Sequence, residues 1–535
     1  MTDPSAPRRP DRQPGHHPDR AGTRASVRPS TRQVARRRIY APRVIAWRTL
    51  RAVDEDDAYA NLVLPRLLRE SGLSGRDAAF ATELAYGSLR GRGTYDAILA
   101  ACANRPIDPP LLDALRLGVH QLLATRVASH AAVAATVDLV RAEIGQGAAG
   151  FANAVLRRVS GQDLNAWLDQ LAPAQGTATG AGSATGAGSA TGNQDEDARL
   201  ALRHSHPEWI VRALRDALRH HGRPVEELEQ LLIADNTPAE VTLAVLPGLA
   251  RPQDLSGTPG ELSPYAVRIS GAPGALHAVR QGRARVQDEG SQVVALALAD
   301  APLDGPDQGA WLDLCAGPGG KTALLGAVLA RRRDEGELPA SARVIATEVA
   351  PHRSDLVRTA VAGLESRRTA SGRPTMPEPV VEVHCLDGRE AAEALVVPGH
   401  GFDRVLVDAP CTGLGALRRR PEARWRRTPS HLASLAPLQR ALLRAALEVV
   451  RPGGVVAYVT CSPHPAETTL VVDDVLRRRA DLQRAAPDRQ LWPHRDGTDA
   501  MYLALLRRVP SSPPEQAPPP APHPDPPPDP SRSPA

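Results

Sequence analysis

The stretch Trp311-Leu-Asp-Leu-Cys-Ala-Gly-Pro-Gly-Gly-Lys-Thr322 decides the fold class of this 535-residue chain. An apolar run, typical of a buried strand, leads into a glycine-rich turn and then into a helical segment. In an open parallel sheet, ligands bind beyond the carboxyl ends of the strands, and glycines let backbone N–H groups approach them closely. The start of the following helix also favours negative charge. We therefore predict a loop that binds a nucleotide-type cofactor, made of Cys315, Ala316, Gly317, Pro318, Gly319, Gly320 and Lys321.

Lys321 is the only lysine of the chain, because every other basic side chain is arginine. Composition bias does not explain this lysine, which indicates that a compact positive charge is needed there. The sequence Gly320-Lys-Thr resembles the end of a Walker A loop, but that motif needs a glycine where Cys315 stands. A P-loop NTPase is therefore disfavoured, and a glycine-rich turn without a ligand is the plainer alternative.

Short apolar runs alternate with helical stretches from residue 285 to residue 508, which predicts an α/β domain with a doubly wound parallel sheet. The strand-like runs are Trp311–Leu314, Val344–Ala346, Val380–Val383, Val405–Val407 and Val455–Val459.

The rest of the chain divides by composition and by hydrophobic period. Apolar residues recur at helical spacing between Leu112 and Leu123 and in similar stretches, which predicts an all-helical unit. Residues 176–192 repeat Gly, Ala, Ser and Thr, as flexible linkers do. The predicted units are a disordered basic arm (1–39), an all-helical domain (40–172), a flexible linker (173–197), a small α+β subdomain (198–284), the α/β domain (285–508) and a disordered Pro-rich tail (509–535).

Charge and cysteine content limit the class of protein. The formal net charge is +5 and the sequence pI is about 9.2, which mildly favours a polyanionic partner. The five cysteines are scattered and lack metal-ligand spacing, so we expect neither a disulfide framework nor a metal site, and we expect a cytoplasmic protein. No apolar stretch approaches the length of a membrane span, so we expect no membrane partner.

Acidic residues recur at the ends of the predicted strands, as Glu348, Asp387 and Asp408. A carboxylate after the second strand of such a sheet commonly binds the hydroxyl pair of a ribose. A single acid at this position is more often a helix cap. Three of them around one cofactor loop favour ligand binding.

Two cysteines, Cys411 and Cys461, also follow predicted strands, in turns rich in Pro, Thr and Ser; Cys102, Cys315 and Cys385 are expected to pack as small apolar side chains. A thiolate that adds to C6 of a pyrimidine makes C5 nucleophilic enough to attack an electrophilic methyl group. A base must then remove the C5 proton before the thiol leaves. One cysteine as nucleophile and a second that assists release fit these steps, and spacing alone does not decide which is which.

Three segments in the same order, Asp313–Thr322, Asp408-Ala-Pro-Cys-Thr-Gly413 and Thr460-Cys-Ser462, resemble the motifs of the RNA cytosine-C5 methyltransferases. The segments Gln287–Gln292 and Asp496–Tyr502 look like the family too. The similarity covers the chain from about residue 200 to residue 508.

This resemblance implies a Rossmann-like domain that binds S-adenosylmethionine and methylates C5 of an RNA cytosine. It implies that Cys461 is the nucleophile and that Cys411 assists release. It also implies that residues 315–321, Glu348, Asp387 and Asp408 line the cofactor site, with Lys321 and Asp408 near the flipped base. Glu348 stands where the family more usually has Asp.

The helical unit resembles the RNA-binding antitermination factor NusB in three stretches, Leu111–Leu123, His130-Ala-Ala-Val133 and Phe151–Arg158. A NusB-like domain ahead of a cytosine-C5 methyltransferase is the arrangement of the RsmB (Sun/Fmu) family, which implies small-subunit (16S) ribosomal RNA as the partner. The chain departs from that family by its arm, linker and tail. Two alternatives stay open: a transfer RNA or other RNA as substrate, and a non-catalytic RNA-binding assembly factor.

The segment Leu417-Arg-Arg-Arg-Pro-Glu-Ala-Arg-Trp-Arg-Arg427 holds six arginines around one tryptophan, directly after Cys411. Such a density of charge beside an active site predicts contact with RNA phosphates, and Trp425 could stack on a base or pack internally. The alternative is an arginine-rich helix exposed to solvent.

Overall fold

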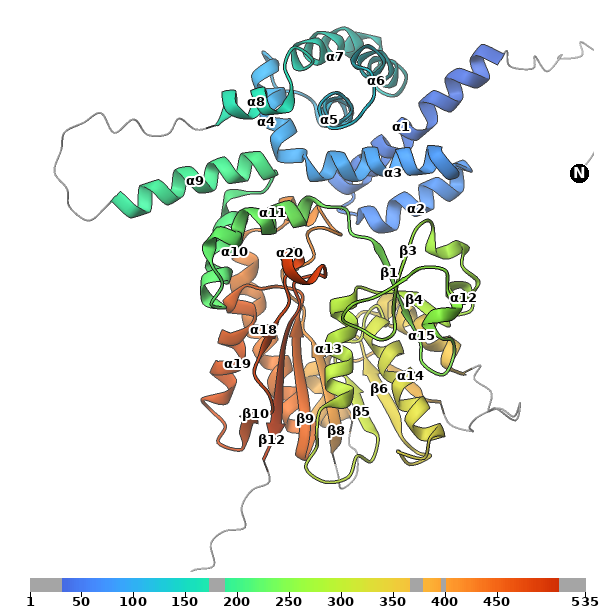
Figure 1. Cartoon of the computed structure of the whole chain (residues 1–535), viewed down its shortest axis with the longest axis vertical. Coiled ribbons are helices and arrows are strands. Elements are labelled where there is room, and N and C mark those ends of the chain that lie inside the picture. The colour runs from blue at the N-terminus through green and yellow to red at the C-terminus, as the bar shows by residue number, and fades with distance from the viewer. Residues whose placement is uncertain (1–30, 173–187, 366–378, 396–400, 510–535) are drawn as a thin grey trace, which may run out of the picture.

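The computed structural model describes residues 31–172, 188–365, 379–395 and 401–509. The first part is a bundle of helices, at the top of Figure 1. The helices are α1 (Thr31–Glu55), α2 (Ala60–Ser71), α3 (Gly75–Arg90), α4 (Arg92–Cys102), α5 (Pro109–Leu123), α6 (Ser129–Glu143), α7 (Gln146–Val159) and α8 (Leu164–Leu171).

Helix α1 begins at Thr31, inside the segment 1–39 that we predicted to be a disordered arm. Arginine, alanine and glutamine favour helices, so the helix of the folded domain continues outward through them. The first 30 residues of the predicted arm lie outside the described residues.

Helix α5 lies at the centre of this bundle, as Figure 1 shows it end-on beside α6 and α7. Every residue from Asp113 to Gln121 is buried. The buried carboxylate of Asp113 is paired with Arg51 and Arg116, at 2.9 and 2.7 Å, which offsets the cost of removing it from water.

Three helices connect the bundle to the rest of the molecule: α9 (Gly188–His204), α10 (Glu208–His220) and α11 (Leu228–Asn236), with the 3-10 turn η1 (Val225–Glu227). Residues 188–197 are therefore helical, although we predicted a linker up to residue 197. The tertiary contact explains the difference, because buried Asp197 in α9 lies 2.7 Å from the guanidinium of Arg215 in α10. Residues 173–187 of the predicted linker lie outside the described residues.

A small antiparallel sheet follows, with the strand order β2-β3-β1-β4. Its elements are β1 (Val241–Val245), η2 (Pro252–Asp254), β2 (Thr258–Pro259), β3 (Ala266–Ile269), η3 (Pro273–Ala275), α12 (His277–Arg280) and β4 (Ala284–Val286).

The last part is an α/β domain whose sheet has the order β10-β12-β9-β8-β5-β6-β7. The strands β9, β8, β5, β6 and β7 are parallel to one another. Strand β12 pairs antiparallel with β9, and β10 and β11 each pair antiparallel with β12. The strands are β5 (Ala310–Asp313), β6 (Arg343–Thr347), β7 (Val381–His384), β8 (Phe402–Asp408), β9 (Val450–Thr460), β10 (Leu482–Arg484), β11 (Arg489–Gln490) and β12 (Tyr502–Arg508). The helices are α13 (Glu289–Asp300), α14 (Gly320–Asp334), α15 (Pro351–Glu365), η4 (Gly388–Glu390), α16 (Ala391–Ala394), α17 (Ala423–Arg426), α18 (Pro429–Val449), η5 (Pro465–Glu467), α19 (Thr469–Leu476) and α20 (Pro493–Asp496).

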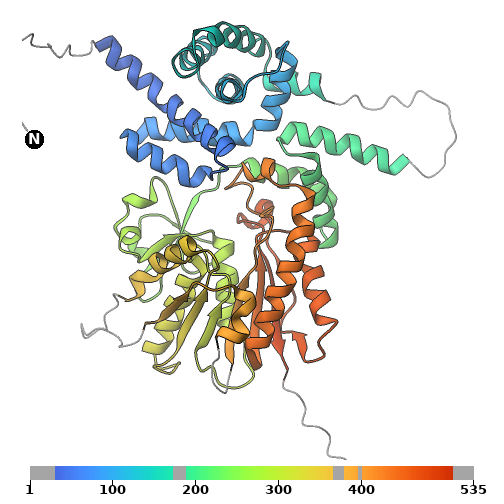
Figure 2. The ribbon, with the colours of Figure 1, turned by 180° about the vertical axis from the view of Figure 1, so that it is seen from behind.

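Helices cover both faces of this sheet, as the opposite views of Figures 1 and 2 show. Alternate residues of one strand therefore belong to two cores: Val455 and Ala457 of β9 face one, Val456 and Tyr458 the other. This double burial explains why the strands read as continuous apolar runs. The predicted doubly wound sheet is confirmed.

Within the described ranges, no helix has both the length and the apolar character needed to cross a bilayer. The same residues contain no group of three or more His, Cys, Asp or Glu side chains placed to hold a metal ion. The predicted tail lies, beyond Val509, outside the described residues.

Candidate active site

The glycine-rich turn connects β5 to α14 and leaves no room for side chains where it meets the neighbouring strand and helix. Gly319 has a φ of 96°, which favours glycine, and an added Cβ would lie 2.4 Å from the Cβ of Ala360. A Cβ on Gly317 would lie 2.1 Å from Oε2 of Glu348. The turn is therefore packed closely against Glu348 at the end of β6 and against Ala360 of α15.

Glu348, directly after β6, lies against this turn. Its Oε2 accepts a hydrogen bond from the N–H of Gly317 at 3.1 Å, and its Oε1 accepts one from the N–H of Ala350 at 3.1 Å. Arg353, which the sequence did not single out, donates to the carbonyl of Gly317 at 2.7 Å and lies 3.4 Å from Glu348. The structure thus brings the predicted acid and the predicted loop into contact.

Asp387 follows β7 and has a local partner. Its carboxylate caps the turn η4 by accepting from the N–H of Arg389 at 2.9 Å, and it lies 2.6 Å from the guanidinium of the same residue. The hydrogen bond from Arg389 lowers the pKa of Asp387 below its ordinary value. The capping role that the sequence left open is therefore present, and ligand binding by Asp387 stays a prediction.

Lys321 and Asp408 form an ion pair between the glycine-rich turn and the end of β8. Lys321 Nζ lies 2.8 Å from Asp408 Oδ2. Burial by itself lowers the pKa of Lys321, but the charge and hydrogen bond of Asp408 outweigh it and raise this pKa. The single lysine of the chain is thus held as an ammonium ion at the sheet edge.

Cys411 and Cys461 meet beyond the ends of two adjacent strands. β8 and β9 are parallel with Asp408 opposite Val459, so the turns after them leave from the same edge. The two Sγ atoms are 3.3 Å apart. The hydrogen bond between the thiols lowers the pKa of Cys461 and raises that of Cys411 well above its usual range.

Two positive charges near this pair act in the same direction as the hydrogen bond between the thiols. Arg420 and Lys321 favour the ionised form of Cys461, against the opposing effects of burial and of Asp408. The Cys461 sulfur is therefore the one that loses its proton first, while the Cys411 thiol donates to it. This arrangement can supply a thiolate nucleophile at the end of β9.

The other three cysteines differ in exposure. Cys102 is buried and Cys315 is half-buried, and burial raises the pKa of Cys315 well above its usual range. The prediction that Cys385 packs internally is wrong, because this residue is exposed, with its Sγ 3.7 Å from the carbonyl of Val349. It lies past the end of the outermost parallel strand, where no neighbour covers it among the described residues.

Two residues around Cys411, Glu467 and Gln439, were missed in the sequence. Glu467 is fully buried and accepts hydrogen bonds from Thr412 and from Gln439. Gln439 also donates to the carbonyl of Pro410 at 2.9 Å. Glu467 follows Cys461 by only six residues, so its closeness to the Thr-Cys motif was the one available signal.

Four of the six arginines of the segment 417–427 bind groups within the protein, whereas Arg420 is exposed, so RNA contact by this segment stays a prediction. Arg418 and Arg419 are paired with Asp288 and Asp499, and the two Arg418 contacts are both 2.9 Å long. Their acidic partners come from segments far away in sequence, which is why the sequence did not indicate this pairing.

The second half of this segment joins the α/β domain to the helices. Arg424 is fully buried and donates to the carbonyls of Ser205 and Asp235 and to the side chain of Asn236, at 3.2, 2.8 and 2.7 Å. Arg426 donates to the carbonyl of Val53 at 2.7 Å. Trp425 is half-buried, and a Cβ on Gly93 would lie 2.4 Å from its ring, so it packs internally.

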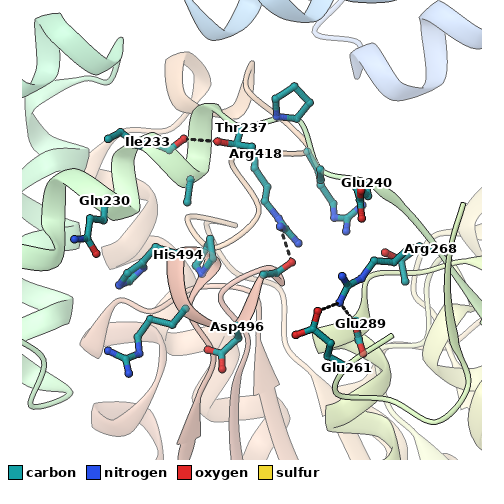
Figure 3. Close-up of a pocket in the computed structure, with 18 residues that line it drawn as sticks. Gln230, Ile233, Thr237, Glu240, Glu261, Arg268, Glu289, Arg418, His494 and Asp496 are labelled. Carbon is teal, nitrogen blue, oxygen red and sulfur yellow. Dashed lines mark hydrogen bonds and ion pairs between the residues drawn. The ribbon is translucent and has the colours of Figure 1, made fainter. Parts of the chain in front are cut away.

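A cavity of about 790 Å³ lies between α11, the small sheet and α20. Figure 3 shows Arg268 beside Glu261 on one wall and Arg418 on another. Arg268 lies 2.8 Å from Glu261. The described residues that line the cavity include neither of the two paired cysteines nor the glycine-rich turn, so this cavity is separate from the candidate active site.

Comparisons with known proteins identify the families that both parts of the chain resemble. Residues 301–507 match the family described as 16S rRNA methyltransferase RsmB/F, and residues 40–161 match the NusB family. A protein of Mycobacterium tuberculosis (strain ATCC 25618 / H37Rv) named as a methyltransferase is 49% identical over 497 residues, which cover 89% of this chain and 98% of that protein.

Two further likenesses support the architecture. The ribosomal RNA small subunit methyltransferase B of Xanthomonas campestris pv. campestris is 30% identical over 501 residues, covering 88% of this chain and 97% of its own length. The crystal structure of PH0851 superposes with a TM-score of 0.66 at 19% identity, and covers 88% of this chain and 99% of that one. The latter likeness concerns the fold alone.

Proposed function

Because the chain belongs to the RsmB/F family of 16S rRNA methyltransferases, we propose that it methylates C5 of one cytosine in small-subunit ribosomal RNA through a covalent bond between Cys461 and C6. The coarser activity is that of an S-adenosylmethionine-dependent RNA methyltransferase with a NusB-like domain. The observation that carries the finer proposal is the pair of thiols 3.3 Å apart, of which only Cys461 has a lowered pKa.

The residues at the sheet edge fit S-adenosylmethionine. Gly317 and Gly319 lack side chains, so the backbone of the turn packs directly against Glu348 and Ala360, and the Glu348 carboxylate lies beside the turn. In our proposal residues 315–321, Glu348 and Asp408 hold the cofactor, and Asp387 joins them on release from Arg389. The cofactor supplies a methyl group on a positively charged sulfur.

Cys461 starts the proposed reaction. Its thiolate adds to C6 of the flipped cytosine, which forms the S–C6 bond and makes C5 an enamine-like nucleophile. C5 then takes the methyl group and for a moment carries both the methyl group and its original hydrogen. The ion pair of Lys321 and Asp408 borders this position and offers a donor and an acceptor to the edge of the base.

Cys411 completes the reaction in this proposal. The largest cause of its raised pKa is its hydrogen bond to Cys461. When Cys461 becomes a neutral thioether this coupling ends, so the pKa of Cys411 falls at the stage when a base is needed. The Cys411 thiol then loses its own proton to solvent, and the resulting thiolate accepts the C5 proton. The electrons of the C5–H bond re-form the C5–C6 double bond, the S–C6 bond breaks, and Cys461 leaves as a thiolate.

The choice of small-subunit ribosomal RNA rests on the relatives. The Xanthomonas relative, which matches nearly the full length of this chain, carries ribosomal RNA small subunit methyltransferase B as its name. The NusB-like domain adds a second RNA-binding unit to the same chain. Transfer RNA and a non-catalytic assembly role are the outcomes that the following experiment separates.

Methyl transfer from labelled S-adenosylmethionine to unmodified small-subunit ribosomal RNA tests the proposal. We expect Cys461→Ala to lose more than about 1000-fold in rate, and Cys411→Ala to accumulate a covalent protein–RNA adduct. Cys102→Ala, in the core of the helical domain, is the matched control and keeps the wild-type rate. Labelling of transfer RNA alone would refute the substrate, and full activity of Cys461→Ala would refute the mechanism.

A further inference from the structure

Glu467 lies at the end of η5, on the same short segment that carries Cys461, and its side chain reaches across to the turn of Cys411. Its carboxylate accepts the N–H of Thr412 at 2.8 Å, the hydroxyl of Thr412, and the side-chain amide of Gln439 at 3.2 Å. The residue is fully buried. A buried carboxylate is costly unless its oxygens are satisfied, so these three donors define one arrangement of the turn.

The backbone is held on both sides of Cys411. Gln439 donates to the carbonyl of Pro410 at 2.9 Å, and Glu467 accepts from the N–H of Thr412. Glu467 is itself fixed, because its carbonyl accepts from the hydroxyl of Tyr458 at 2.9 Å. The position of the Cys411 sulfur therefore depends on a carboxylate that touches neither thiol.

We propose that Glu467 is a positioning residue for Cys411, which holds the turn of residues 410–412 so that the two thiols stay within hydrogen-bond distance. The inference deepens the function proposed above and rests on it for the roles of the two sulfurs. The negative charge of Glu467 also raises the pKa of Cys411 and so helps to keep this thiol protonated. Any apolar side chain of similar size would fill the same space, and only the carboxylate accepts all three hydrogen bonds.

The ionisation of the two thiols tests this inference without RNA. The rate of alkylation of Cys411 and Cys461 by iodoacetamide is followed against pH, with each peptide identified by mass spectrometry. In Glu467→Gln we expect the Cys411 pKa to fall and the Cys461 pKa to rise, each by about one unit, because the turn is released and the charge is removed. Glu448→Gln, which changes an exposed acid of α18, is the matched control and leaves both unchanged.

Thr412→Val is the second variant, because it removes only the hydroxyl that Glu467 accepts. We expect a smaller shift in the same directions, with a circular dichroism spectrum equal to that of the wild type. If Glu467→Gln fails to fold, this variant decides the question. Unchanged thiol pKa values in the variants that fold would overturn the inference, even where the melting temperature falls.

Turnover on RNA gives an independent second readout. Glu467→Gln should accumulate the protein–RNA adduct expected of Cys411→Ala, with kcat lowered by about 10- to 100-fold and KM for RNA within about 2-fold of wild type. A wild-type protein that fails to methylate cytosine would refute the proposed function, while the thiol titration would still decide the role of Glu467. A variant that loses activity through KM alone, without an adduct, would contradict the positioning role.

Discussion

Asp313, at the end of β5, is a buried carboxyl group beside the cofactor loop. Its Oδ2 accepts the hydroxyl of Thr322 at 2.7 Å, and burial raises its pKa to about 7, against the effect of that hydrogen bond. The acid is therefore neutral in the folded chain at a pH where the unfolded chain is ionised. Its contribution to stability is complete below its ordinary pKa of 3.8 and is lost as the pH rises towards 7.

We expect Asp313→Asn to remove this part of the pH dependence. Between pH 5 and pH 7, the free energy of unfolding of the wild type should fall by about 2 kcal/mol relative to the variant, because each pH unit in that window costs about 1.4 kcal/mol. Urea unfolding at several pH values measures the difference. Asp304→Asn, at an exposed acid, is the control. Parallel curves for the wild type and Asp313→Asn would contradict the raised pKa.

Gly317 tests the cofactor loop. An added Cβ would lie 2.1 Å from Oε2 of Glu348, so Gly317→Ala must displace the carboxylate or the turn. We expect the Kd for S-adenosylmethionine to rise at least about 10-fold while the fold is kept, as measured by calorimetric titration. Gly150→Ala, in α7, where a Cβ meets nothing within 4 Å, is the matched control. An unchanged Kd would remove Gly317 from the proposed site.

At the scale of elements, the segment 413–427 is the principal link between the chemistry and the helices. It starts beside Cys411, and the N–H of Gly415 donates to the carbonyl of Cys461 at 2.9 Å. Further along, Glu422 accepts from the N–H of Ala60 at 3.2 Å, and Arg424 reaches Ser205. The turns that carry both cysteines are thus tied to the NusB-like domain by hydrogen bonds.

Arg424→Met should weaken this link, because methionine fills a similar volume and donates no hydrogen bonds to the buried carbonyls. We expect a loss of about 2–5 kcal/mol and, in calorimetry, the separation of one unfolding transition into two. Arg477→Met, at an arginine whose side chain is 69% exposed, is the control. The salt dependence of RNA binding should not change, because a buried guanidinium releases no counterions on binding. A shallower decrease of the RNA binding constant with salt concentration in the variant would identify Arg424 as a phosphate contact.

At the scale of the whole molecule, the NusB-like helices stand beyond the carboxyl ends of the parallel strands, as Figure 1 shows. Hydrogen bonds from the α/β domain to the helices support this arrangement, because Arg424 donates to the carbonyl of Ser205 and Arg426 to the carbonyl of Val53. An RNA bound by the helices is therefore close to the edge where Cys411 and Cys461 lie. The same arrangement explains why four arginines of the segment 417–427 bind groups within the protein.

The sequence alone determined the local features of this protein. Apolar runs that are buried on both faces, such as Val405–Val407 and Val455–Val459, predict strands without knowledge of their neighbours. The glycine turn at 315–321 and the two cysteine motifs were recognisable because each is a continuous stretch with a backbone or chemical requirement of its own.

Only the tertiary structure decided what depends on partners distant in the chain. The arginines of 417–427 could equally have faced RNA, and the groups that bind four of them come from α1 and α11, from Ser205 directly after α9, and from Asp288 and Asp499. The same holds for Glu467, whose role exists only where η5 and the turn after β8 meet. Short-range patterns fix strands and turns, but the protonation of a thiol or the partner of a charge is set by groups that folding brings together.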